Sequence, residues 1–194
     1  MYQLLRVILF SFLLFMLAGC GNGAVSIVSS NHLCPEDMTE TEFAVELEEE
    51  LDKLNQWIET KTFRLKLPDD WTYEYKEEEM TVDFYTGSGV HTGELYQADF
   101  QKDEPAPMYI PNHATMESCA VIQAEHPQIR YGFLFHESPA GAVEQVNLYN
   151  HQFVIYDYSQ PDYNFAYILT LSDSQVSSKQ ARAIIETFER KDEP

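Results

Sequence analysis

The chain has 194 residues, of which 32 are Asp or Glu and 12 are Lys or Arg, so its net charge is −20 at pH 7. Affinity for phosphates and anionic headgroups comes from cationic side chains, so this charge argues against nucleic acids and against direct contact with a lipid surface. Basic proteins, cationic peptides and divalent cations stay open as partners, although a solubilising surface explains the charge more simply. Aromatic residues make up 13% of the chain, which argues against disorder and favours one domain with a sizeable core.

The first nineteen residues have the pattern of an export signal. Arg6 precedes an apolar run over residues 7–17, and small residues come after that run. The run is too short to span a bilayer, which takes about 20 apolar residues, but it suits a secretory signal peptide.

The tetrapeptide Leu17-Ala18-Gly19-Cys20 resembles the lipobox of bacterial lipoproteins. This resemblance implies cleavage before Cys20 and a diacylglyceryl group on its sulfur. The protein would then be attached to the cell membrane by acyl chains and face away from the cytoplasm. In a Gram-negative cell it would lie in the periplasm or on the outer membrane. The membrane is therefore one expected partner, through the lipid on Cys20. An ordinary signal peptide or an uncleaved anchor is the alternative.

The remaining sequence divides into a short connection and one domain. Residues 20–38 are rich in Gly, Ser and Asn and are interpreted as the lipidated cysteine and its tether, 39–190 as the domain, and 191–194 as a tail. Cys34 and Cys119 are the cysteines left after Cys20. Export permits a disulfide between them, but many exported lipoproteins keep free thiols, so both alternatives stay open.

The domain begins with a predicted helix over residues 39–58. Thr39 and Glu42 fit a capping box, and an apolar stripe continues from them at spacings of three and four residues. An acidic face lies opposite this stripe and is most simply a solvated surface. The stripe consists of Phe43, Leu47, Leu51, Leu54 and Ile58.

Period-two alternation then predicts a series of strands. We expect strands at 63–67, 80–85 and 96–100, an interior strand at 119–124, and strands at 129–135, 143–149, 152–158 and 165–171. Turns are expected at 68–70, 87–89, 150–151 and 160–162. Ser177 and Gln180 form a second capping box before a C-terminal helix, whose apolar face would be Ala181, Ile184, Ile185 and Phe188. The predicted fold is a single α+β domain, in which an antiparallel sheet of seven or eight strands is flanked by an N-terminal and a C-terminal helix.

Two segments resemble the Mog1/PsbP-like superfamily. They are FRLKLPDDWTYEY at 63–75 and ARAIIETFE at 181–189, so the resemblance spans about 63–190. It implies a central antiparallel sheet between helices and a role as a binding or assembly module. The superfamily has no shared catalytic residues to transfer to this chain.

The sequence offers no strong catalytic or metal motif. The glycines of TGSGV at 86–90 are too close for a nucleophile elbow and suit a hairpin turn. Cys119 with His126 or His136 would make a Cys–His pair, but a cysteine inside an apolar strand is more often a core residue. His91 and His113 are the histidines that loops could bring together, yet no metal-ligand spacing is present. We therefore expect no metal, no cofactor and no catalytic residue.

An aromatic cluster is the remaining candidate. Tyr156, Tyr158, Tyr163 and Phe165 either stack a sugar or peptide or form cross-strand pairs, and we expect the structural role. The expected function is a lipid-anchored, non-catalytic module that binds or assembles another envelope protein, with a basic partner favoured by the charge. The alternatives are a small envelope hydrolase without a recognisable motif and an immunity-type inhibitor lipoprotein.

Overall fold

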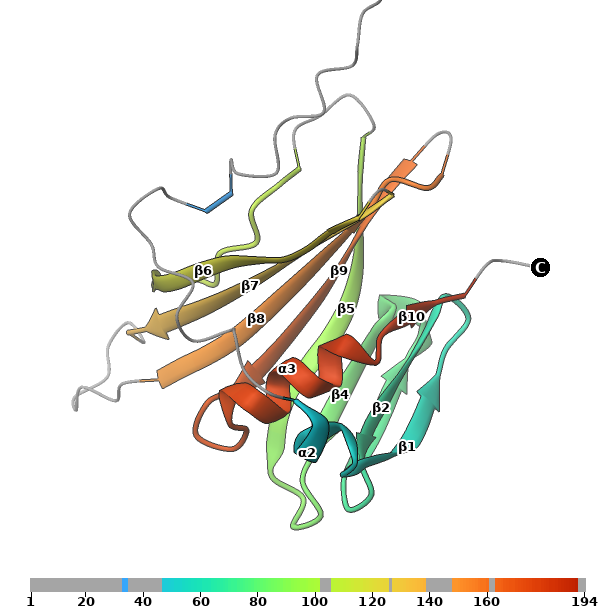
Figure 1. Ribbon diagram of the computed structural model, residues 1–194, viewed down its shortest axis with the longest axis vertical. Coiled ribbons are helices and arrows are strands. Elements are labelled where there is room, and N and C mark those ends of the chain that lie inside the picture. Colours follow the sequence, from blue (N-terminus) through green and yellow to red (C-terminus); the bar gives the residue numbers. More distant parts are fainter. Residues whose placement is uncertain are drawn as a thin grey trace, which may run out of the picture. The chain divides into compact units, whose positions relative to one another are not determined.

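The computed structural model describes residues 33–34, 47–101, 106–125, 127–138, 148–160 and 163–191. These residues form a single α+β domain with two antiparallel sheets, an N-terminal helix and a C-terminal helix (Figure 1). The predicted fold class is confirmed. The signal segment and Cys20 lie outside the described residues. Among the residues that are described, neither helix has the length and hydropathy needed to span a bilayer.

The larger sheet has seven strands in the order β3-β4-β5-β9-β8-β7-β6. Its strands are β3 (Thr72–Lys76), β4 (Thr81–Tyr85), β5 (His91–Gln101), β6 (Ala114–Glu125), β7 (Gln128–Glu137), β8 (Leu148–Asp157) and β9 (Tyr163–Ser172). A short 3-10 helix, η2 (Glu77–Glu79), precedes β4. After β5 the chain passes to the far edge of the sheet, and β6 to β9 return as a meander to pair with β5.

The smaller sheet has three strands in the order β1-β2-β10. β1 (Leu54–Glu59) and β2 (Phe63–Pro68) form a hairpin, and β10 (Glu189–Arg190) pairs with the other side of β2. The described helices are α2 (Glu48–Leu51) and α3 (Ser178–Glu186). The sequence pattern does not predict this second sheet.

The helix predicted over 39–58 is wrong in its second half. Residues 39–46 lie outside the described residues, helix α2 covers only 48–51, and 54–59 form strand β1. Leu54 and Ile58 are buried as expected, but two residues four apart share a face of a strand as well as a face of a helix. The apolar spacing therefore predicts burial correctly and the type of element incorrectly.

The C-terminal helix agrees with its prediction. The Ser177 hydroxyl accepts a hydrogen bond from the Gln180 backbone N–H at 3.2 Å, which caps α3. The predicted apolar positions of α3 are buried between the two sheets. They join the inner side of the small sheet and one face of the large sheet in one core, which includes Leu54, Ile58, Phe63, Leu65, Phe84, Phe153, Leu169, Ala181, Ile184, Ile185 and Phe188.

The other face of the large sheet carries a second apolar core. Leu33, Cys34 and the segment 106–109 pack against it, together with Phe133, Tyr156 and their neighbours. The prediction of an interior strand at 119–124 is wrong, because these residues belong to β6, which is an edge strand. Ala120 and Ile122 face the first core, whereas Cys119 and Val121 face the second. The continuous apolar run thus reflects a strand covered on both faces.

The turn predicted at 150–151 is also wrong. Both residues lie inside β8, where the Asn150 amide donates to Glu137 Oε1 at 2.6 Å and His151 is 1% exposed. His151 Nε2 lies 2.7 Å from Asp173 Oδ1, so the buried polar ring is paired with a carboxylate. The strands predicted at 143–149 and 152–158 are one described strand, β8, which begins at Leu148. Residues 143–147 lie outside the described residues.

Candidate functional site

Cys34 and Cys119 form a disulfide, with 5.3 Å between their Cα atoms. The bridge ties the N-terminal segment to β6 over the second core, where Cys119 is 1% exposed. Cys119 is therefore not a thiol nucleophile. Of its two candidate bases, His126 lies outside the described residues, and His136 stacks on Tyr149 with 4.9 Å between the ring centroids.

The structure does not bring His91 and His113 together. His91 begins β5 and His113 precedes β6, and strands β9, β8 and β7 lie between these two strands. His91 is instead near Asp83, at 3.7 Å between Nε2 and Oδ1. Within the described parts of the chain, no group of three or more His, Cys, Asp or Glu side chains is arranged to hold a metal ion.

The predicted aromatic cluster is divided between the two faces of the large sheet. Tyr156 and Tyr158 belong to the second core, Phe165 packs against the first, and Tyr163 is 58% exposed. The Tyr156 hydroxyl donates to the Pro107 carbonyl oxygen. The four residues therefore do not form one binding surface.

Five tyrosines do gather in the second core: Tyr96, Tyr109, Tyr131, Tyr156 and Tyr158. Burial raises the pKa of each phenol, to about 12 for Tyr131. Neutral phenols of this kind are poor general bases at neutral pH. Because segment 106–109 and Leu33 pack over them, this tyrosine cluster is a structural core.

An exposed site lies instead on the outer side of the small sheet. Trp57, in the middle of β1, is 43% exposed. The Arg64 guanidinium carbon is 4.8 Å and the Lys66 Nζ 5.2 Å from the centroid of its ring. Both distances suit cation–π contacts, worth about 0.5–1 kcal/mol each at exposed positions. We call Trp57, Glu59, Arg64, Lys66 and Glu189 the Trp57 face.

Strand register places these side chains side by side. Trp57 is the cross-strand partner of Lys66, and Arg64 is the partner of both Glu59 and Glu189. Side chains alternate along a strand, so Leu54 and Ile58 point into the core while Trp57 and Glu59 point outward. The face is therefore held on a sheet whose reverse side is buried.

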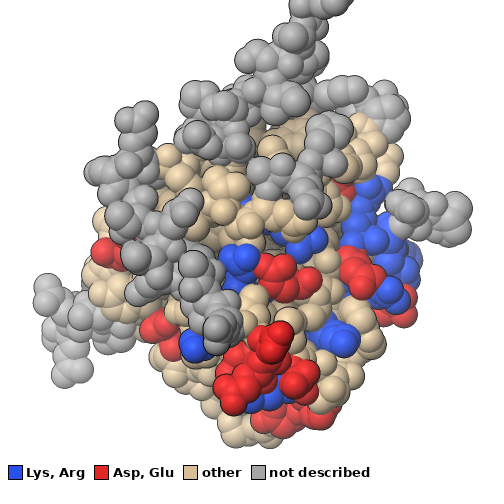
Figure 2. Space-filling view, viewed as in Figure 1, with Lys and Arg blue, Asp and Glu red and all other residues tan. Residues whose placement is uncertain are grey.

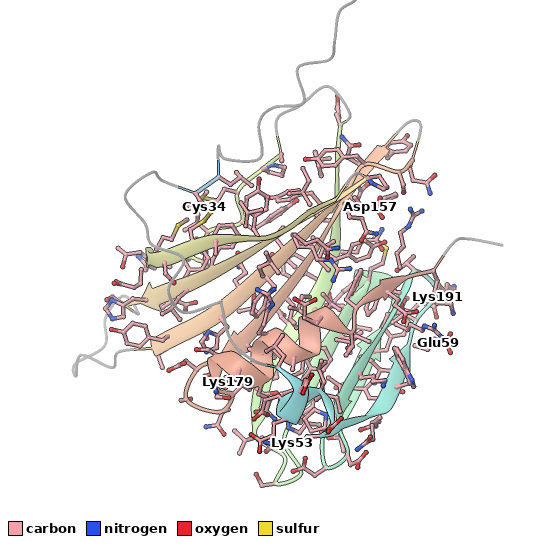
Figure 3. The ribbon with its side chains drawn as sticks, in the orientation of Figure 1. Cys34, Lys53, Glu59, Asp157, Lys179 and Lys191 are labelled. Carbon is pink, nitrogen blue, oxygen red and sulfur yellow. A yellow bond between two sulfur atoms is a disulfide. The ribbon has the colours of Figure 1, made fainter. Side chains whose placement is uncertain are left out.

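The charges of the Trp57 face are unevenly compensated. Arg64 Nε donates to Glu189 Oε2 at 2.8 Å, and Lys191 Nζ lies 3.1 Å from Glu59 Oε1. Figure 3 labels Lys191 and Glu59 together at this side of the domain. Lys66 forms no ion pair with any described residue. Its ammonium is thus the cation of this face that a partner can neutralise.

Two contacts fix the small sheet to the rest of the domain. The Thr187 hydroxyl, at the end of α3, accepts a hydrogen bond from the Lys66 backbone N–H at 2.8 Å. Arg190 in β10 reaches Asp157, which is fully buried, at 3.2 Å. Breaking a buried charge pair leaves an uncompensated charge, so this pair holds β10 against the end of β8 in the large sheet. The Trp57 face is accordingly built on rigid elements.

Cationic residues are concentrated around this face. Five of the twelve Lys and Arg residues belong to the β1–β2 hairpin, to β10 or to the residue after it: Lys61, Arg64, Lys66, Arg190 and Lys191. Arg190 is 12% exposed and paired with buried Asp157, so the other four are the cations near the face. Figure 2 shows blue side chains gathered on the right, over the hairpin and β10, and red side chains gathered over α2. The charge of −20 is therefore not uniform, and the Trp57 face is a local exception to it.

The sequence patterns do not predict the Trp57 face, because the apolar spacing assigns 54–59 to a helix. The alternation of FRLKL in β2 does place Arg64 and Lys66 on its polar side. Their contact with Trp57, however, depends on the hairpin register between β1 and β2. A strand prediction for NQWIE, with a short turn after it, would have indicated the same pairing.

Comparisons with known proteins provide no family for the chain. No family model matches it, and no curated protein matches it. A crystal structure from Bacteroides thetaiotaomicron VPI-5482 is similar with 16% identity and a TM-score of 0.37. The alignment covers 68% of this chain and 46% of that one, so this chain spans less than half of that protein's length. The PsbP-like resemblance stays an expectation, and no function follows from these comparisons.

Proposed function

We propose that this protein is a lipid-anchored, extracytoplasmic module that binds another envelope protein through the Trp57 face, without catalysis. The observation that carries the proposal is an exposed tryptophan held beneath two cations on an edge strand. Tryptophan and arginine are among the side chains most enriched at positions that dominate protein–protein binding energy. A rigid sheet that presents both, with its reverse side buried, is suited to recognition of a protein surface.

The disulfide supports the extracytoplasmic part of the proposal. Disulfides persist in oxidising compartments and are rare in the cytosol of most organisms. The Cys34–Cys119 bridge closes a large loop, with a separation of 85 positions between its cysteines, so it constrains the chain well beyond its immediate surroundings. It agrees with the export signal and with a mature chain that begins at Cys20.

The anchor places the binding partner near a membrane. Residues 21–33 connect the proposed lipid on Cys20 to the disulfide, and a chain of that length spans at most about 45 Å when fully extended. Stable attachment by two or more acyl chains would keep the domain within this distance of the bilayer. The expected partner is therefore another component of the same membrane or of the adjacent envelope.

The proposal is tested by affinity capture from solubilised envelopes, compared across three variants. Wild-type protein and Tyr163→Ala should enrich the same partner by quantitative mass spectrometry, whereas Trp57→Ala should lose it. Tyr163 is a matched control because it is also an exposed aromatic residue on a strand. Equal enrichment by Trp57→Ala would contradict a binding role for this face. Thermal unfolding of each variant verifies that all three remain folded.

A further inference from the structure

We propose that the Trp57 face recognises an acidic, extended segment of its protein partner, which lies along strand β1. This inference rests on the proposed function and adds the chemistry of the partner. The overall charge of the chain favours a basic partner, but the local arrangement around Trp57 favours the opposite sign. Three features of the small sheet support this choice: the open edge of β1, the charge of Lys66, and the distance that the Lys66 side chain can span.

The edge of the small sheet is open to strand addition. β1 is the first strand in the order β1-β2-β10, and no described strand pairs with its outer side (Figure 1). Its pairing with β2 has one register shift, between Leu54 and Gln56, and is regular from Gln56 to Glu59, where Trp57 lies. An extended peptide gains main-chain hydrogen bonds at such an edge, and side-chain contacts provide its specificity.

The edges of the large sheet are less suited to the same role. β6 has register shifts between Met116 and Ser118 and between Val121 and Gln123, and the Cys34 disulfide is attached to it. Bulges of this kind protect an edge from further pairing. The cation of the other edge strand, Lys76 in β3, is already paired with Asp83 at 2.6 Å.

The charge of the face favours an acidic segment. Arg64 and Lys191 have carboxylate partners within the chain, whereas Lys66 forms an ion pair with no described residue. A basic segment would place a second cation near Lys66 without providing its counter-charge. The Debye length is about 8 Å at physiological ionic strength, so exposed charges farther away are largely screened. The cations next to Trp57 therefore matter more to a bound segment than the acidic residues of α2.

The reach of the side chains permits contact with Lys66 from the added strand. Adjacent strands are about 4.8 Å apart, so a segment next to β1 would lie roughly 10 Å from β2. Lys66 Nζ lies 5.2 Å from the Trp57 ring centroid, so this ammonium is close to a side chain of β1. A glutamate opposite Trp57 would meet this ammonium above the indole, and apolar atoms of the segment would pack on the exposed part of the ring.

The test selects binders from a displayed library of random octapeptides on the immobilised, full-length protein in detergent. Wild-type protein should enrich peptides with net negative charge. The selected peptides, synthesised individually, should bind Lys66→Glu at least tenfold more weakly than they bind the wild type. Lys53→Glu is the matched control, since it changes the net charge equally. Lys53 is exposed beside α2 and paired with Glu50, and Figure 3 shows it away from Lys191 and Glu59. Binding to Lys53→Glu should change less than twofold.

The outcomes separate this inference from the proposed function. Enriched peptides that are basic or uncharged, but are lost with Trp57→Ala, would retain the face and overturn the acidic partner. Peptides that bind Trp57→Ala as well as wild type, or no enrichment at all, would overturn both. Phosphatidylglycerol vesicles are the competing anionic probe. If the Cys20→Ala protein cosediments with these vesicles, and Trp57→Ala abolishes this cosedimentation, the face binds a membrane and the inference is overturned.

Discussion

Trp57 and Trp71 are the two tryptophans of the chain, and they lie in opposite surroundings. Trp57 is 43% exposed beside two cations, whereas Trp71 is 5% exposed and packs near Phe84 with 6.4 Å between ring centroids. Collisional quenchers therefore act mainly on Trp57. Its fluorescence reports on the electrostatic potential of the Trp57 face without a partner.

We predict that the ratio of iodide to caesium quenching of this fluorescence exceeds the ratio for neutral N-acetyltryptophanamide at equal ionic strength. A local positive potential attracts the anion and repels the cation, even though the whole chain is acidic. Stern–Volmer slopes measure the effect. Lys66→Glu should lower the ratio, and Lys53→Glu should preserve it. A wild-type ratio below that of the free compound would mean that the acidic residues dominate the face.

Buried tyrosines make stability sensitive to alkaline pH. Burial raises the pKa of Tyr131 to about 12 and that of Tyr167 to about 12, although Arg190 acts to lower the latter. The unfolded chain releases these protons near pH 10 while the folded chain retains them, so the free energy of unfolding falls as pH rises from about 10 to about 12. The stabilisation is fully present below about pH 10.

We predict a slope in this range of about −1.4 kcal/mol per pH unit for each such tyrosine. Urea unfolding at several pH values provides the measurement. Tyr131→Phe should make the slope less steep by one such contribution, because phenylalanine has no proton to release. A free energy of unfolding that stays constant from about pH 9 to about pH 12 would contradict the burial of these hydroxyls.

At the scale of elements, helix α3 and strand β1 show what apolar spacing can establish. In α3 the buried positions 181, 184 and 185 include two adjacent residues, a pattern that a half-buried strand does not produce. At 54–59 the buried residues Leu54 and Ile58 fit either element, so the choice depends on tertiary pairing with β2. The C-terminal helix was therefore predictable, and strand β1 was not.

The candidate site was unpredictable for the same reason. Recognising the Trp57 face requires knowing that Trp57 opposes Lys66, and this register arises from the fold of the hairpin. The strand at 119–124 gives a second example. Its apolar residues face two cores, and the covering segments at 33–34 and 106–109 belong to other parts of the chain. Local patterns identified burial here, but they did not identify what provides it.

The disulfide joins two segments that are distant in the sequence. We predict that the Cys34→Ser, Cys119→Ser double variant loses about 2–4 kcal/mol, because the unfolded chain is released from a long closed loop. Urea unfolding of the full chain in detergent measures the difference. Reduction of the wild type should produce a similar shift and leave the double variant unchanged. Equal stability of the oxidised and reduced wild type would contradict a constraining role for the bridge.

For the molecule as a whole, the proposed function joins a membrane anchor to a binding face. The anchor depends on Cys20, the last residue of the lipobox-like tetrapeptide. We predict that cells supplied with a labelled fatty acid attach it to the wild type and to Cys34→Ala, but not to Cys20→Ala. Gel fluorescence of the purified protein measures the label. Equal labelling of Cys20→Ala would contradict lipidation at this residue.

The proposed function requires that the Trp57 face contacts a protein partner in the envelope. A photoreactive amino acid placed at position 59, which points outward from β1 on the same face as Trp57, detects such a contact in living cells, with position 163 as the exposed control. We expect a defined cross-linked protein adduct from position 59 that is lost with Trp57→Ala and absent from position 163. No adduct from position 59, or an adduct that Trp57→Ala leaves unchanged, would contradict the proposed function.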